Sequence, residues 1–178
     1  MGHIHEEPGQ HDQTSSAFII RLDTAEPTLM LHKHRKLGMY LQFGGHVELA
    51  ENPWAAIAHE LTEEAGYDLS DLKILQPVKR IKYLSDAVLH PESVCTNTHV
   101  FREGHFHTDV EYAFTATGPP NRSVAEGEST QIELFTRAEL KALDKSVVYD
   151  NIKQIGEFIF DVCLSEWEQV DTSEFSLR

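Results

Sequence analysis

The chain contains only two cysteines, Cys95 and Cys163, and no long run of apolar residues. Two cysteines are too few for a disulfide framework, so we expect a protein of the reducing cytoplasm. A membrane-spanning helix needs about 20 consecutive apolar residues, and no stretch approaches that length. The polar start MGHIHEEPGQ also lacks the apolar segment of a signal peptide. We therefore expect neither a membrane protein nor a disulfide-stabilised secreted domain.

Positive charge is also scarce. The 15 Lys and Arg residues are outnumbered by 29 Asp and Glu residues, which gives a formal net charge of -14 at pH 7. Proteins that bind duplex nucleic acid normally carry basic surfaces, because phosphate contacts by Lys and Arg dominate that affinity. We therefore expect no nucleic acid duplex as a partner. An acidic protein can still bind a small phosphate compound where divalent cations stand between the two.

The 178 residues are 40% apolar, which suits one compact domain with a hydrophobic core. Apolar and alternating runs between turn residues predict strands near residues 14–22, 28–32, 40–43, 72–84, 97–102 and 107–117. Helices are predicted at residues 53–65, in the segment RAELKAL after Thr136, and at residues 146–169. This order predicts a mixed α/β (α+β) domain with helices packed on a sheet.

The same patterns suggest how the chain is divided. We expect residues 1–12 to form a polar N-terminal lead and residues 13–165 to form the domain, including most of a long C-terminal helix. Residues 166–178 would then be the helix end and a C-terminal tail. His3, His5 and His11 make the lead rich in histidine, which is compatible with a solvated tail or with binding of transition metals.

The final helix carries apolar residues beyond its main buried stripe, namely Phe158, Phe160 and Trp167. Apolar surface in excess of one packing face favours a homodimer, and a helix buried within the domain is the alternative. Cys163 is expected to be a small core residue.

The helix at residues 53–65 concentrates negative charge. Asn52 as N-cap and Pro53 at the first position predict its start, and Gly66 predicts its end. Glu60, Glu63 and Glu64, here called the box glutamates, stand at i, i+3 and i+4 and share a face, where like charges repel. Mg²⁺ prefers such oxygen ligands, and the preceding Gly44 and Gly45 allow the backbone to come close. A solvated acidic face is the alternative interpretation.

The stretch from Gly45 to Tyr67 resembles the Nudix box, G-x5-E-x7-R-E-U-x-E-E-x-G-U, where U is a bulky apolar residue. The residues in register are Gly45, Glu51, Glu60, Leu61, Glu63, Glu64, Gly66 and Tyr67. His59 stands where the family has arginine. The resemblance implies a Nudix-type α/β/α sandwich, with a mixed sheet on which the box helix and the C-terminal helices pack.

The resemblance also implies a function. Nudix hydrolases cleave a nucleoside diphosphate linked to another group, using Mg²⁺ or Mn²⁺ and attack of water on phosphorus. By the family pattern the box glutamates are catalytic and bind metal, together with the Gly45 carbonyl. The family arginine pairs with the glutamate at the position of Glu51, so His59 is expected to replace it as a weaker positioning residue. The general base would be a box glutamate or one of Asp109, Glu111, Glu128 and Glu133.

Substrate contacts are less well defined by the sequence. His105, His107 and Asp109 alternate along a predicted strand and would share one face, as part of a substrate pocket, a second metal site or a polar strand surface. Arg35 lies in a basic run that either attracts substrate phosphates or forms a solvated turn. Substrate-binding candidates are therefore Arg35, Gly44, His107, Asp109 and Glu128.

Two rival functions are compatible with the fold. A catalytically silent Nudix module that senses a ligand would explain His59, but the retained box glutamates argue against it. Isopentenyl-diphosphate isomerases are similar in fold and length, but they use a cysteine before the box-like helix, and the segment QFGGHVE has none. ADP-ribose, nucleotide sugars, dinucleoside polyphosphates and nucleoside triphosphates all stay open as substrates.

Overall fold

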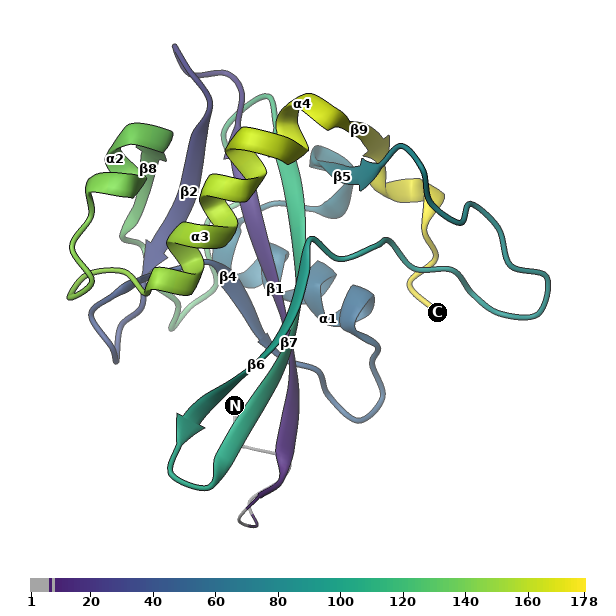
Figure 1. Ribbon diagram of the computed structural model, residues 1–178, viewed down its shortest axis with the longest axis horizontal. Helices are drawn as coiled ribbons and strands as arrows, with labels where there is room; N and C mark the ends of the chain where they lie inside the picture. The colour runs from purple at the N-terminus through teal and green to yellow at the C-terminus, as the bar shows by residue number, and fades with distance from the viewer. Residues whose placement is uncertain (1–6, 8) are drawn as a thin grey trace.

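The computed structural model describes residue 7 and residues 9–178 (Figure 1). Within these residues one mixed sheet has the order β3-β2-β1-β7-β5-β9, and β4 pairs with β1, β6 with β7 and β8 with β2. The strands are β1 (His11–Arg21), β2 (Thr28–Lys33), β3 (Tyr40–Leu41), β4 (Phe43–His46), β5 (Lys73–Pro77), β6 (Cys95–Arg102), β7 (His105–Ala116), β8 (Ile132–Thr136) and β9 (Trp167–Asp171).

Helices pack on both faces of this sheet, which confirms the predicted fold class. They are α1 (Pro53–Glu60) with its π-helical continuation η1 (Leu61–Ala65), α2 (Arg137–Ala142), and α3 (Asp150–Phe158) followed by η3 (Ile159–Cys163) and α4 (Leu164–Glu166). Single 3₁₀ turns are η2 (Leu69–Asp71) and η4 (Thr172–Glu174). Among the described residues no helix has the length and apolar character needed to cross a membrane.

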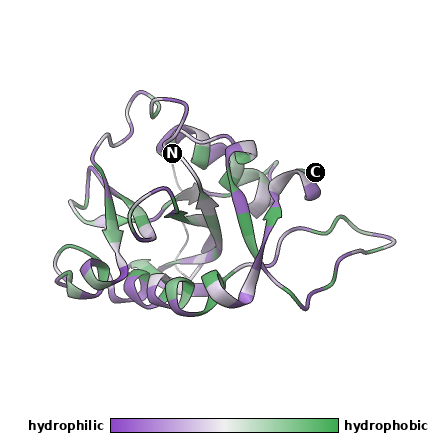
Figure 2. Cartoon of the chain, turned by 90° about the horizontal axis from the view of Figure 1, so that it is seen from above, coloured by the Kyte–Doolittle hydropathy of each residue, from purple (hydrophilic) through white to green (hydrophobic). Residues whose placement is uncertain are grey.

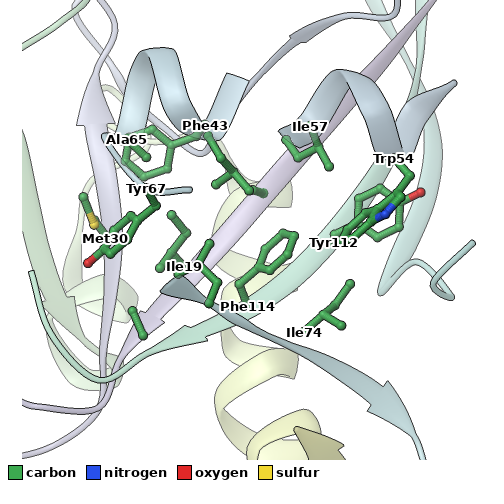
Figure 3. Close-up of a cluster of buried hydrophobic side chains, with 14 of the residues drawn as sticks. Ile19, Met30, Phe43, Trp54, Ile57, Ala65, Tyr67, Ile74, Tyr112 and Phe114 are labelled. Atoms are coloured by element: carbon green, nitrogen blue, oxygen red, sulfur yellow. The ribbon is translucent and has the colours of Figure 1, made fainter. Parts of the chain in front are cut away.

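The centre of the sheet is the parallel pair β1 and β7, which is in register from His11 opposite Phe106 to Arg21 opposite Ala116. Successive side chains of a strand point to opposite faces, so each strand contributes to two cores. Ile19 of β1 and Trp54 of α1 both belong to the first core, which Figure 3 shows. Phe18 packs with Ile152 of α3 in the second.

The C-terminal segment differs from the prediction of one helix over residues 146–169. The helix begins at Asp150, after a turn in which Val147 N–H donates to Asp144 O, and it ends at Glu166. Residues 167–171 form β9, which pairs antiparallel with β5 and places Val170 opposite Ile74. Val170 is buried in the first core. Pairing with the edge of β5 is therefore favoured over extension of the helix beyond Glu166. Cys163 is fully buried, as expected.

The predicted strand at residues 72–84 is also too long, because β5 ends at Pro77. Proline has no N–H to donate to a strand ladder, and residues 78–94 then run outside any strand. This segment projects from the rest of the fold in two perpendicular views, with apolar residues along it (Figures 1 and 2). Its exposed apolar side chains are Val78, Ile81, Tyr83, Leu84 and Val88.

Candidate active site

The box helix, α1 with η1, forms where the sequence predicts it. The Asn52 side chain caps it by accepting a hydrogen bond from Ala55 N–H at 3.0 Å, and Gly66 ends it with a left-handed φ of 72°. Trp54, Ile57 and Leu61 are fully buried against the sheet. The helix is therefore fixed on one face of the sheet, and this orientation positions the box glutamates.

Strand β4 approaches these carboxylates through its two glycines. Gly44 N–H donates to Glu64 Oε2 at 2.8 Å. A Cβ atom added at Gly45 would lie 2.2 Å from Glu60 Oε1, so a side chain there would displace that carboxylate. The glycine pair thus lets backbone and carboxylates meet at one place, which is the close approach that a site for a cation and a phosphate compound requires.

The electrostatics of the box glutamates fit a cation. Burial raises the pKa of Glu60 to about 7 and that of Glu64 to about 8. The negative charges of Glu63 and Glu128 contribute to both of these raised pKa values. Buried carboxylates that repel one another are stabilised in their charged form by a bound divalent cation, and an all-oxygen donor set suits Mg²⁺ or Mn²⁺.

His59 lies between two carboxylates. Its Nε2 atom is 3.0 Å from Glu63 Oε1 and its Nδ1 atom is 3.7 Å from Glu51 Oε1. The interaction with Glu63 is the main cause that raises the pKa of His59. Glu51 is held in turn by Glu48 N–H, which donates to its Oε2 atom at 3.4 Å. The imidazole therefore contacts the side chain at the Glu51 position and one box glutamate together.

Two predicted substrate-binding residues line one open hollow of about 510 Å³. Arg35 donates to Gly127 O, and Glu128, the next residue of that loop, also lines the hollow. The loop that carries Glu128 returns to the box helix, because Ala125 N–H donates to Glu63 O at 2.7 Å. Of the four candidates outside the box for a general base, Glu128 is the one whose charge raises the pKa of Glu60 and Glu64.

The other candidates lie elsewhere. His105, His107, Asp109 and Glu111 alternate as buried residues of β7, so they share one face as predicted. That face is the α3 side of the sheet, because Ala113, two residues after Glu111, belongs to the second core. His107 and Asp109 are therefore not gathered with the box glutamates. Glu133 lies on β8, where Tyr40 OH donates to its carboxylate.

The structure adds Asp12 and His46, which the sequence did not indicate, to His105 and His107, for which the sequence left a second metal site open. Asp12, His105 and His107 each offer a ligand atom, and these atoms lie within 4.8 Å of one another. His46 also contacts Asp12, with 3.5 Å between Nε2 and Oδ2. Only the β1–β7 and β1–β4 pairing brings these residues together. His3 and His5 lie outside the described residues.

Known proteins share this fold. A family model described as the NUDIX domain matches residues 12–154. A NUDIX-family hydrolase from Clostridium perfringens is 25% identical with a TM-score of 0.67, and the match covers 84% of this chain and 96% of that one. The Ap4A hydrolase of C. elegans, in a binary complex, is 15% identical with a TM-score of 0.59, over 81% and 91% of the two chains. The NUDIX domain of NrtR from Shewanella oneidensis, solved with ADP ribose, is 12% identical with a TM-score of 0.59, over 83% and 86%. No curated protein matches the chain significantly.

The chain belongs to the NUDIX family, since the family model covers most of its length. It is a Nudix hydrolase, of a class that acts on nucleoside diphosphate derivatives. The resemblance inferred from the box is thereby confirmed, as is the fold. The roles of individual site residues stay predictions.

Proposed function

We propose that this chain is a metal-dependent pyrophosphohydrolase that cleaves a nucleoside diphosphate linked to another moiety, by attack of water on phosphorus. The observation that carries the proposal is the meeting of the box glutamates with the β4 glycines, where Gly44 N–H donates to Glu64. Candidate substrates are ADP-ribose, nucleotide sugars, dinucleoside polyphosphates and nucleoside triphosphates. The similarity to a protein solved with ADP ribose and to an Ap4A hydrolase supports this range.

The metal proposed is Mg²⁺ or Mn²⁺, held by the box glutamates and the Gly45 carbonyl. When bound, it supplies neutralisation of the phosphate oxygens and polarisation of the phosphorus centre. The chain's own residues then position the reactants. His59 and Glu51 hold Glu63 in place, and a box glutamate or Glu128 accepts the proton of the attacking water.

The substrate is proposed to extend from the box glutamates toward the hollow at Arg35. Lys33 and Arg35 bring positive charge to this hollow, in a chain with a strongly negative net charge. A phosphate group lies favourably against such a positive patch. Gly44 would contribute the close backbone approach on the other side. His107 and Asp109 are buried on the opposite face of the sheet and are not part of the proposed substrate path.

The test is product release from a panel of the four substrate classes, with Mg²⁺ or Mn²⁺ and with neither. Hydrolysis of one class is expected, with strict dependence on the metal. Glu63→Gln and Glu64→Gln should abolish it, because both changes remove a negative charge at nearly constant size. Glu126→Gln, an exposed residue of the Glu128 loop, is the matched control and should keep full activity.

The alternative function gives a different result. A silent ligand-sensing module would bind one of these compounds in calorimetry without turning it over. Turnover that survives both box substitutions would overturn the proposed site.

For quaternary structure and location we propose a cytoplasmic protein that forms a homodimer through the final helix. Phe160 and Trp167 pack against the second core. Of these three apolar residues, Phe158, with 42% of its surface exposed, is therefore the one left to contact a second copy of the chain. The free Cys95 and Cys163 suit a reducing compartment. Light scattering after size exclusion tests the dimer, which Phe158→Ser should weaken, and cell fractionation tests the location.

A further inference from the structure

A second group of metal-ligating side chains lies on the sheet face turned away from the box helix. It consists of Asp12, His46, His105 and His107, here called the aspartate–histidine cluster. We propose that this cluster binds a divalent transition-metal ion of the Zn²⁺ class, at a site separate from the box glutamates. The proposal does not depend on the hydrolase activity.

Sheet register explains why the four residues meet. Asp12 lies opposite His107 in the parallel β1–β7 pair, and His46 lies opposite Thr14 in the β1–β4 pair. His105 and His107 are two residues apart in β7, so both side chains point to the same face. Three strands therefore place ligands at one location, although the residues span most of a hundred positions of sequence.

The spacing of the ligand atoms suits tetrahedral coordination. Zn–N and Zn–O bonds of about 2.0–2.1 Å place neighbouring ligand atoms of a tetrahedron about 3.3 Å apart. Asp12 Oδ2 lies 3.2 Å from His105 Nε2 and 3.5 Å from His46 Nε2. His107 offers a further ligand atom within 4.8 Å of those of Asp12 and His105. Asp12, His105 and His107 thus form the assembled part of a coordination shell, and His46, which contacts Asp12, would complete the shell by moving toward the ion.

The types of ligand select the metal. Three imidazoles and one carboxylate suit Zn²⁺ and related transition metals, whereas Mg²⁺ takes oxygen ligands. Asp12, His105 and His107 are 1%, 3% and 7% exposed, and the ring of Phe101 stacks on His107 with 4.5 Å between centroids. A cation inside such a partly apolar enclosure is attracted strongly by the buried carboxylate, because the local dielectric constant is low.

The cluster cannot share its ion with the box. A Cβ at Gly45 would meet Glu60, so that residue faces the box helix, and His46, the next residue of β4, faces the opposite side. An ion at the cluster would instead tie the start of β1 and the end of β4 to the β6–β7 hairpin. Its expected role is structural, with stability rather than turnover as the main property that responds.

The experiment uses the full chain, freed of metal by a chelator and then kept in millimolar Mg²⁺. Zn²⁺ binding is measured by competition with a chromophoric chelator, and Co²⁺ is substituted to record the visible absorption of a tetrahedral site. The expected result is one tightly bound Zn²⁺ per chain and a rise in melting temperature. His105→Gln and His107→Gln should each lower the affinity by more than about 100-fold, since even partners of ligands contribute 10–100-fold.

Two control variants distinguish this site from the box glutamates and from histidines elsewhere in the chain. Glu64→Gln should keep the Zn²⁺ affinity, and so should His90→Gln, a half-buried histidine of the projecting segment. The proposal is overturned if the wild-type chain shows no stoichiometric Zn²⁺ and no tetrahedral Co²⁺ band. It is equally overturned if His105→Gln and His107→Gln retain the ion, as they would for binding by the N-terminal lead alone, or if Glu64→Gln loses it. The wild-type Co²⁺ spectrum decides the matter if a variant fails to fold.

Discussion

The Nε2 atom of His59 lies 3.0 Å from the Oε1 atom of Glu63, one turn further along the box helix. Because His59 is 42% exposed, this contact should contribute less than about 1 kcal/mol to folding, and its value should lie in positioning Glu63. We expect His59→Ala to lower kcat by about 10-fold with little change in melting temperature. His59→Arg should leave kcat similar to that of the parent protein or raise it. A large loss in the arginine variant would contradict the positioning role.

Gly45→Ala tests the close approach of β4 to the box. The new Cβ would lie 2.2 Å from Glu60 Oε1, and the carboxylate would have to move away. We expect a higher Mg²⁺ concentration for half-maximal activity and a loss of about 10-fold or more in kcat/KM. The fold should be retained, because the displaced carboxylate is the end of a flexible side chain and can move without shifting the backbone. Gly118→Ala is the control, because a Cβ atom there has no neighbour within 4 Å. Equal effects of the two substitutions on activity would show that the close approach of Gly45 to Glu60 is not required.

Glu111 makes stability depend on pH. Burial raises its pKa to about 8 from 4.5, so the folded chain keeps a proton that the unfolded chain releases. The contribution of Glu111 to the free energy of unfolding is therefore fully present below pH 4.5 and is lost as the pH rises through about 8. Glu111→Gln removes this titration and keeps an oxygen to accept from Asn97 Nδ2. The free energy of unfolding is measured with urea at about pH 5 and pH 8. Between these two pH values the variant should become more stable relative to the parent, by on the order of a few kcal/mol.

Parallel pH curves for the two proteins would show that Glu111 ionises normally. The control Glu126→Gln changes an exposed carboxylate and should leave the pH dependence as it is. The parent's slope should persist in part in the Glu111 variant, because the pKa values of Glu60 and Glu64 are raised as well.

Strand β9 should be part of the cooperative fold. Val170 is 5% exposed in the first core, and truncation to alanine should lower the free energy of unfolding by roughly 1–3 kcal/mol. Leu177→Ala, at a side chain that is 49% exposed, should cost almost nothing. Chemical denaturation of both variants measures the difference. Equal stability of the two would indicate that the β5–β9 pair frays independently.

The box helix could be predicted from the sequence because its signals are local. Asn52, Pro53 and Gly66 set its ends through nearest-neighbour chemistry, and the spacing of the box glutamates places them on one face. The same applies to His105 and His107, whose common face follows from alternation alone.

Features that depend on distant partners could not be predicted. The end of the last helix is decided by the β5 edge that Trp167–Asp171 joins, and no residue near Glu166 marks it. The place of Asp12 beside His105 and His107 depends on the register of β1 against β7, which lies more than ninety residues away in the sequence. The hollow shared by Arg35 and Glu128 likewise needs the return of a loop to the box helix.

The parallel pairing of β1 with β7 has a consequence for how the protein folds while it is synthesised on the ribosome. His11 cannot find its partner strand until Phe106 has been synthesised, and β5 gains its outer neighbour only with Trp167–Asp171. Contacts so distant in sequence require closure of long loops before they stabilise anything, which slows folding. Until β7 is synthesised, the nascent chain can pair β1 only with β2 and β4, so the edge of β1 that β7 will occupy stays open and is the natural place for a chaperone to bind.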